Sequence, residues 1–185
     1  MRILIRGGSI EAGVGVSRGY VDILREHYGS RGIEVTNRSR PGETSFAAVE
    51  RFVEAIASFK PEVLVLHFGI DDAFSAVYRS EFKENLVRII RRARENSRPE
   101  IFLLTSHAFD DPYEMDAVNI YNRTVREVAV DLACTMVPIH TAWAGYLLDQ
   151  GLPGSALLQK DVRLPNEKGH EFYASVLIHH LDGIV

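Results

Sequence analysis

Short apolar runs alternate along the chain with longer segments of helical periodicity. The runs Val63–Leu66 and Ile101–Leu104 are continuously apolar, which is typical of strands covered on both faces. The predicted strands are residues 2–6, 33–37, 62–68, 100–105 and 134–139. The predicted helices are residues 16–31, 45–59, 81–97, 114–132 and 167–182. This order predicts a three-layer α/β/α sandwich of the flavodoxin-like kind with a five-stranded parallel sheet.

Length and composition indicate one globular domain. The chain has 185 residues, 46% of them hydrophobic and 25% charged, and no stretch has the composition of a linker. We therefore expect a single domain over residues 1–185. The segment 140–166 has the least regular pattern. The lone cysteine, Cys134, lies in an apolar run and is interpreted as a small buried side chain.

The net charge and the first residues of the chain limit which partners and which cellular location we expect. A net charge of −4 gives no electrostatic reason to expect nucleic acid or an anionic membrane as partner. No apolar run approaches the roughly 20 residues of a membrane helix. The first residues are too weakly apolar for a signal-peptide core, so we expect a cytoplasmic protein. The sequence does not indicate an oligomeric state.

In proteins with a parallel sheet, the functional residues lie in the loops that follow the strands. The first of them, residues 7–15, holds Ser9 in a glycine-rich turn. A dinucleotide fingerprint fails because Arg18 stands at the third glycine, and the Gly-Lys-Ser/Thr of a P-loop is absent. A nucleophile elbow fails because Glu11 stands at its last glycine. What remains is a serine in a tight turn between a strand and a helix.

Four segments carry a family resemblance. They are Gly7-Gly8-Ser9-Ile10, Asn37–Thr44, Gly69-Ile70-Asp71-Asp72 and Asp161–His170. Their order and their places after the strands resemble the blocks of the SGNH (GDSL-type) hydrolases. In that family these blocks are Gly-Asp-Ser, a loop with one glycine, Gly-x-Asn-Asp and Asp-x-x-His. The resemblance implies the SGNH hydrolase fold and an ancestral activity on acyl or acetyl esters.

The resemblance also implies roles for individual residues. Ser9 takes the place of the nucleophile, Gly42 of an oxyanion donor and Asp161 of the residue that orients the histidine. Asp71 stands where the family has the oxyanion asparagine, and Leu164 stands where it has the catalytic histidine. The ligand implied is a small-molecule or carbohydrate acyl ester, and neither a cofactor nor a metal is implied.

The two replacements weaken the expected chemistry. Serine needs a neighbouring base because its own pKa is far too high for spontaneous ionisation, and leucine cannot accept a proton. Loss of the triad histidine costs on the order of 10⁶ in turnover in another serine hydrolase. An ionised Asp71 would place negative charge beside the developing oxyanion, and loss of one oxyanion donor costs about 10²–10³.

Three compensations are open from the sequence. Asp71 could remain protonated beside Asp72 and donate a hydrogen bond. A substitute base could come from His107, in the loop after the fourth strand, or from His67, at the end of the third strand, both of which we expect near the rim of the cleft. His107 is better placed because loop residues can reach inward, and His170 is a poorer candidate. A metal site has the right ligand types but no recognised spacing. Its ligands would be Asp71, Asp72, His107, Asp110 and Asp111.

Two functions from different classes remain. The first is a hydrolase of this family that uses Ser9, Asp161, Asp71 and Gly42, with its activity weak or lost. The alternative is a pseudoenzyme that binds an acylated or carbohydrate ligand in the old cleft without hydrolysis. A histidine ring nitrogen close to the Ser9 hydroxyl would favour the enzyme, and its absence would favour the binding protein.

Overall fold

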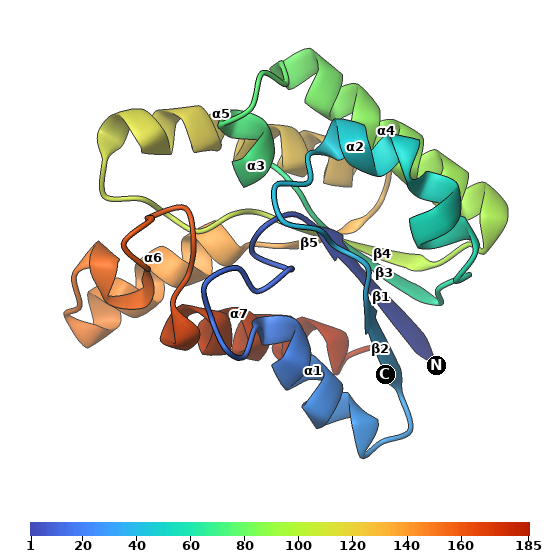
Figure 1. Ribbon diagram of the computed structural model, residues 1–185, viewed down its shortest axis with the longest axis horizontal. Helices are drawn as coiled ribbons and strands as arrows, with labels where there is room; N and C mark the ends of the chain where they lie inside the picture. The colour runs from blue at the N-terminus through green and yellow to red at the C-terminus, as the bar shows by residue number, and fades with distance from the viewer.

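The computed structural model describes residues 1–185 and has one five-stranded parallel sheet, with the strand order β2-β1-β3-β4-β5 (Figure 1). This is the strand order of flavodoxin-like folds. The strands are β1 (Arg2–Gly7), β2 (Glu34–Asn37), β3 (Val63–His67), β4 (Glu100–Leu104) and β5 (Thr135–Val137). The predicted sheet is confirmed.

Helices cover both faces of the sheet (Figure 1). One face carries α1 (Tyr20–Gly29), α6 (Ile139–Gln150) and α7 (Glu167–Leu181), and the other carries α2 (Ser45–Glu50), α4 (Arg79–Asn96) and α5 (Pro112–Asp131). Successive strand residues point to opposite faces. In β1, Ile3 and Ile5 therefore join the first core, and Leu4 joins the second. The predicted three-layer sandwich is confirmed.

Several element boundaries differ from the sequence prediction. The helix expected from residue 16 begins at Tyr20, because residues 9–15 form a series of turns and residues 16–19 are irregular. The helix expected over 45–59 is divided into α2 and a short π-helix, η1 (Val53–Ala57). A further short helix, α3 (Ile70–Ala73), follows β3.

The segment 140–166, expected to be irregular, begins with helix α6 and continues with a 3₁₀ turn, η2 (Gly154–Leu157). The apolar residues of α6 are spread around the helix instead of forming one stripe. Trp143 is fully buried, whereas Leu148 is 81% exposed. An even distribution gives no amphipathic signal, which is why the helix is hard to predict. Helix α6 ends at Gly151, which has φ of 60°.

The carboxyl ends of β1, β2 and β3 bring three loops together at one edge of the sheet. These loops hold Ser9, Gly42 and Asp71. The segment between η2 and α7 reaches the same edge. None of the helices combines the length and the apolar character needed to cross a bilayer.

Candidate active site

The residues singled out at the ends of the strands line one cavity of about 350 Å³. Ser9 follows β1, Gly42 lies in the loop after β2, and Asp71 lies in α3 after β3. Asp161 and Leu164 close the cavity from the segment before α7. The parallel sheet thus assembles in space what the sequence spreads over more than 150 positions.

The Ser9 hydroxyl is held by two groups. Its Oγ donates to Asp71 Oδ1 at 2.8 Å and accepts from the Gly42 backbone N–H at 2.9 Å. The Ser9 backbone N–H donates to Asp71 Oδ2 at 2.8 Å. The backbone donors of Ser9 and Gly42 therefore both point at this site, but each already has a partner within the protein.

Asp71 and its neighbour Asp72 are carboxyls with raised pKa values. Burial raises the pKa of Asp71, against the lowering effect of the hydrogen bonds from Ser9. Burial also raises the pKa of Asp72 to about 6, although Ser45 donates to Asp72 Oδ1 from both its backbone N–H and its hydroxyl. Asp72 Oδ2 accepts from the Gly69 N–H at 3.1 Å. Asp72 thus supports the loop, and Asp71 faces the cavity.

Gly8 leaves room for the Asp71 carboxylate. A Cβ at residue 8 would collide with Asp71 Oδ2 and would lie 2.8 Å from the carbonyl oxygen of Glu43. The close approach of Asp71 to Ser9 therefore requires a residue without a side chain at position 8.

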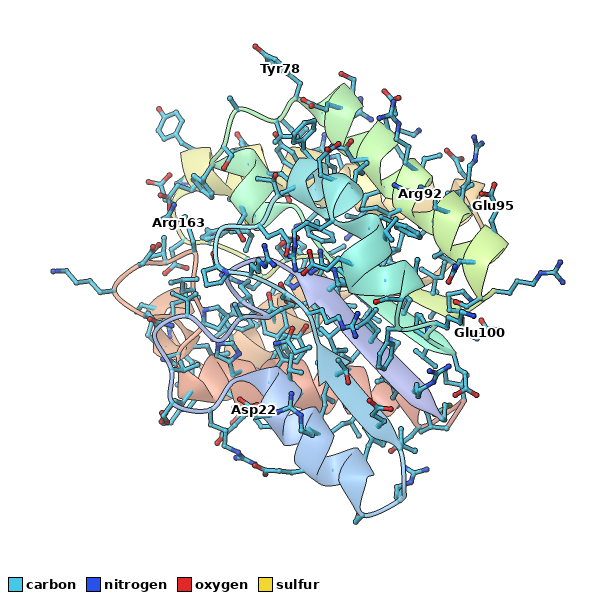
Figure 2. The ribbon with its side chains drawn as sticks, turned by 45° about the vertical axis from the view of Figure 1, so that its right-hand side comes forward. Asp22, Tyr78, Arg92, Glu95, Glu100 and Arg163 are labelled. Atoms are coloured by element: carbon cyan, nitrogen blue, oxygen red, sulfur yellow. The ribbon has the colours of Figure 1, made fainter.

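Asp161 is paired with an arginine. Arg163 donates to Asp161 from Nε at 2.8 Å and from Nη2 at 2.6 Å, and these bonds lower the pKa of Asp161. The Arg163 guanidinium also lies over the Phe74 ring, 5.4 Å from its centroid. Figure 2 shows Arg163 on the opposite side of the molecule from Arg92 and Glu95 of α4. Leu164 is partly buried against the core.

His67 does not lie at the rim of the cleft, contrary to our expectation. It is only 3% exposed, and its Nδ1 lies 2.6 Å from Glu11 Oε1. Its Nε2 lies 3.3 Å from Ser106 Oγ. Since β3 is a central strand covered on both faces, a side chain at its end is drawn into the core and its polar atoms find buried partners.

His107, which we also expected near the rim, is instead buried and engaged elsewhere. It is fully buried, with Nδ1 2.9 Å from the Tyr173 hydroxyl and Nε2 3.2 Å from the Val162 carbonyl oxygen. Burial lowers the pKa of His107 to about 3 and the pKa of His170 to about 4. His170 Nδ1 accepts from the Tyr20 backbone N–H at 3.2 Å. The Ser9 hydroxyl makes no hydrogen bond to any of these histidines.

The side chains considered as metal ligands make contacts with different partners in the structure. No three histidine, cysteine, aspartate or glutamate side chains are grouped closely enough to hold a metal ion. Asp111, for example, caps α5 by accepting from the N–H groups of Tyr113 and Glu114. Asp72 is held by Ser45, and His107 by Tyr173.

Sequence reasoning missed the role of Glu11. This side chain is 3% exposed and accepts from the Gly8 backbone N–H at 2.9 Å and from the Tyr20 hydroxyl at 3.1 Å. It therefore holds the Ser9 turn from beneath. The available signal was its position, because it stands two residues after the serine, where an elbow would have glycine.

Comparison with known proteins gives consistent matches. The family model described as "GDSL-like Lipase/Acylhydrolase family" matches residues 6–172. Esterase TesA of Pseudomonas aeruginosa is 25% identical over 147 residues, which is 77% of this chain and 72% of that protein.

Solved structures share the fold at lower identity. An acetyl xylan esterase, AlAXEase, has a TM-score of 0.86 at 19% identity, with all of both chains covered. LAE5, an α/β hydrolase from the metagenome of Lake Arreo, has a TM-score of 0.85 at 22% identity and covers 100% of this chain and 96% of its own. Axe2, an acetylxylan esterase from Geobacillus stearothermophilus, has a TM-score of 0.82 at 22% identity and covers 97% and 93%.

Proposed function

The chain belongs to the GDSL-like lipase/acylhydrolase family, and from this we propose that its Ser9 cavity binds a small-molecule or carbohydrate acyl ester while ester hydrolysis through Ser9 is weak or lost. One observation carries the proposal. The Ser9 hydroxyl is bonded to a carboxylate and a backbone N–H, and the histidines considered as its base are bonded to other groups.

The first deficit is the base. Leu164 lines the cavity beside Ser9 but has no atom that accepts a proton. Asp71 accepts the Ser9 hydrogen bond, but a carboxylate is a far weaker base than the alkoxide it would have to generate. We therefore expect a loss on the order of 10⁶ in turnover relative to a complete serine–histidine pair.

The second deficit concerns the oxyanion. The Ser9 N–H is bonded to Asp71 Oδ2, and the Gly42 N–H is bonded to Ser9 Oγ. Both donors must release these partners before they can stabilise a developing negative charge. An ionised Asp71 would then stand beside that charge. The loss of each good donor costs about 10²–10³ in turnover, and the two deficits act on one transition state, so they are not multiplied.

Axe2 supports the assignment of the missing histidine. Its structures described as catalytic mutants replace a serine, an aspartate and a histidine, and the last two are three positions apart. Asp161 and Leu164 have the same spacing. Restoring a histidine at position 164 is therefore the direct test of the lost base.

The test is a gain of activity. In Leu164→His combined with Asp71→Asn, we expect hydrolysis of an activated acetyl ester to rise at least about 10²-fold over wild type, which corresponds to one recovered oxyanion donor. Adding Ser9→Ala must remove the gain. Fast wild-type hydrolysis that Ser9→Ala abolishes would contradict the loss of activity. Fast wild-type hydrolysis insensitive to Ser9→Ala would contradict the site.

Ligand binding is tested separately in wild type. The matched esterases AlAXEase and Axe2 suggest an acetylated xylo-oligosaccharide as the probe. We expect saturable binding by calorimetry and its loss in Val14→Trp, because Val14 lines the cavity and an indole would fill it. Val130→Trp is the matched control on the exposed surface of α5. Equal binding by both variants would exclude the cavity as the binding site.

A further inference from the structure

A second cavity, of about 400 Å³, is lined by the loop that joins β2 to α2, by the C-cap of α2 and by the η1 turn. It has no hydrophobic lining residue, and we call it the arginine basin. Its lining residues are Arg38, Ser39, Arg40, Arg51, Glu54 and Ser58. None of them lines the Ser9 cavity. We propose that the arginine basin binds a small phosphate-type oxyanion, free or as the phosphate group of a soluble ester.

The charge of the arginine basin is opposite to that of the whole chain. Three arginines and one glutamate line it, which gives 3 − 1 = +2, whereas the chain carries −4. The buried pair of Arg6 and Glu43 beneath it adds one charge of each sign and leaves this balance unchanged. A concave surface with excess positive charge attracts anions, and arginine binds the oxygens of phosphate in a forked geometry.

Glu54 already occupies the place that such an anion would take. Its Oε1 accepts from Arg40 Nη2 at 3.1 Å and from Arg51 Nη2 at 3.3 Å. One carboxylate oxygen is thus shared by two guanidinium groups. The Glu54 side chain is 64% exposed, so it can rotate into solvent and leave both arginines to an incoming oxyanion.

Polar atoms of the arginine basin also remain without partners. Neither Ser39 Oγ nor Arg51 Nε makes a hydrogen bond, although both atoms are buried. An unpaired buried donor is costly, and a ligand is one way to satisfy it. Two of the three arginines are fixed in place by contacts other than those with the Glu54 carboxylate. Arg51 Nη1 donates to Glu43 Oε1 at 2.7 Å, and the Arg38 guanidinium lies 5.2 Å from the centroid of Phe59.

The backbone at the arginine basin is unusual as well. Glu54 belongs to the π-helical turn η1, and Ser58 is its C-cap. Single π-helical turns are rare and occur frequently at functional sites. The absence of hydrophobic lining residues favours a soluble anion over a lipid, whose acyl chains would need an apolar surface.

The experiment is a calorimetric titration of the full chain with inorganic phosphate at constant ionic strength. Arg40→Ala removes one exposed guanidinium, and we expect it to weaken binding about tenfold. Glu54→Gln removes the competing charge and should tighten binding several-fold. Arg88→Ala and Glu84→Gln are matched controls, because this exposed pair lies on α4 away from the arginine basin, and we expect affinities close to wild type.

Three results would overturn the proposal. The first is an absence of saturable phosphate binding in wild type and in Glu54→Gln. The second is an equal loss in Arg40→Ala and Arg88→Ala, which would indicate a general charge effect. The third is binding only to vesicles that contain phosphatidate, measured by co-sedimentation, with no response to inorganic phosphate. All variants change exposed side chains, and circular dichroism verifies that they fold.

Discussion

Two serines that follow strands of the sheet, Ser9 after β1 and Ser106 after β4, lie in opposite environments. Ser9 lines an open cavity, and its hydroxyl contacts Asp71 and no histidine. Ser106 is 1% exposed, yet its hydroxyl lies 3.3 Å from His67, whose other nitrogen lies 2.6 Å from Glu11. The order serine, histidine, carboxylate is thus present in the interior, where no substrate has access.

In this chain the serine that lies beside a histidine and the serine that lines a cavity are therefore different residues. The interior set is a structural network. Glu11 supports the Ser9 turn through Gly8, and Asn122 holds the Ser106 backbone by accepting from its N–H at 2.8 Å. A buried ionisable pair of this kind is stable only when its hydrogen bonds are satisfied. The exposed set has the cavity, but its serine is hydrogen-bonded to Asp71 and Gly42 and to no histidine.

The sharpest test of this contrast replaces each of the two serines in turn by alanine in the variant Leu164→His with Asp71→Asn. Ser9→Ala should return its rate on an activated acetyl ester to background, a loss of at least about 10²-fold. Ser106→Ala should leave the rate within about twofold, because Ser106 is inaccessible. A loss of activity in correctly folded Ser106→Ala, measured by steady-state kinetics, would contradict the structural role.

Breaking the interior network should cost the most stability. Glu11→Ala removes the partner of His67 and the acceptor of the Gly8 N–H, and we expect the free energy of unfolding to fall by about 3–5 kcal/mol. Glu95→Ala, on the exposed surface of α4 (Figure 2), should change it by less than about 0.5 kcal/mol. Urea denaturation compares the two, and equal losses would show that the network does not stabilise the fold.

We expect acid pH to lower the free energy of unfolding through protonation of the buried His107. Its pKa falls from 6.5 to about 3 on folding, so its contribution is complete above pH 6.5 and is lost as the pH falls toward 3. Between pH 7 and pH 4.5 this amounts to about 2–3 kcal/mol. Asp72, with a raised pKa, acts in the opposite direction, because its stabilising effect is greatest at low pH.

The difference between wild type and His107→Gln isolates the histidine, since Asp72 is common to both. Urea denaturation at the two pH values should show a smaller acid loss in His107→Gln than in wild type. An identical loss in the two proteins would exclude His107 as its source.

The smallest effect is expected at the open site. Arg163→Ala breaks the pair with Asp161. The two side chains are 46% and 38% exposed, so solvent screens their interaction much more than that of a buried pair. We expect a change of less than about 1 kcal/mol in the free energy of unfolding. A loss comparable to that of Glu11→Ala, measured by thermal denaturation, would contradict the division between an open site and a stabilising interior.

The sheet was predictable because its strands are short apolar runs at regular intervals. The continuous runs around Val65 and Leu103 correspond to central strands covered on both faces. Helix α6 and the division at η1 were not predictable. The first has no single apolar stripe, and the second depends on a local change of hydrogen-bond pattern that leaves no periodic signal.

The approach of Ser9, Gly42 and Asp71 to one cavity followed from their places after the strands, and that of Asp161 followed from the family resemblance. The contacts within the site did not follow. The direct bonds of Asp71 to Ser9, and the pairing of His67 with Glu11, depend on side-chain directions across 56 to 62 positions of sequence. Distance from a strand end indicates which residues meet, but not which of their atoms bond.

Gly8 has a consequence for how this site can change over evolutionary time. Any side chain at position 8 would collide with Asp71 and press on the Glu43 carbonyl, next to Gly42. A change of Gly8→Asp, toward the Gly-Asp-Ser block of the SGNH hydrolases, is therefore unfavourable until residue 71 and the Gly42 loop have moved. We therefore expect the effects of substitutions at positions 8 and 71 to be coupled. A substitution at either position therefore changes which side chains the other position can accept.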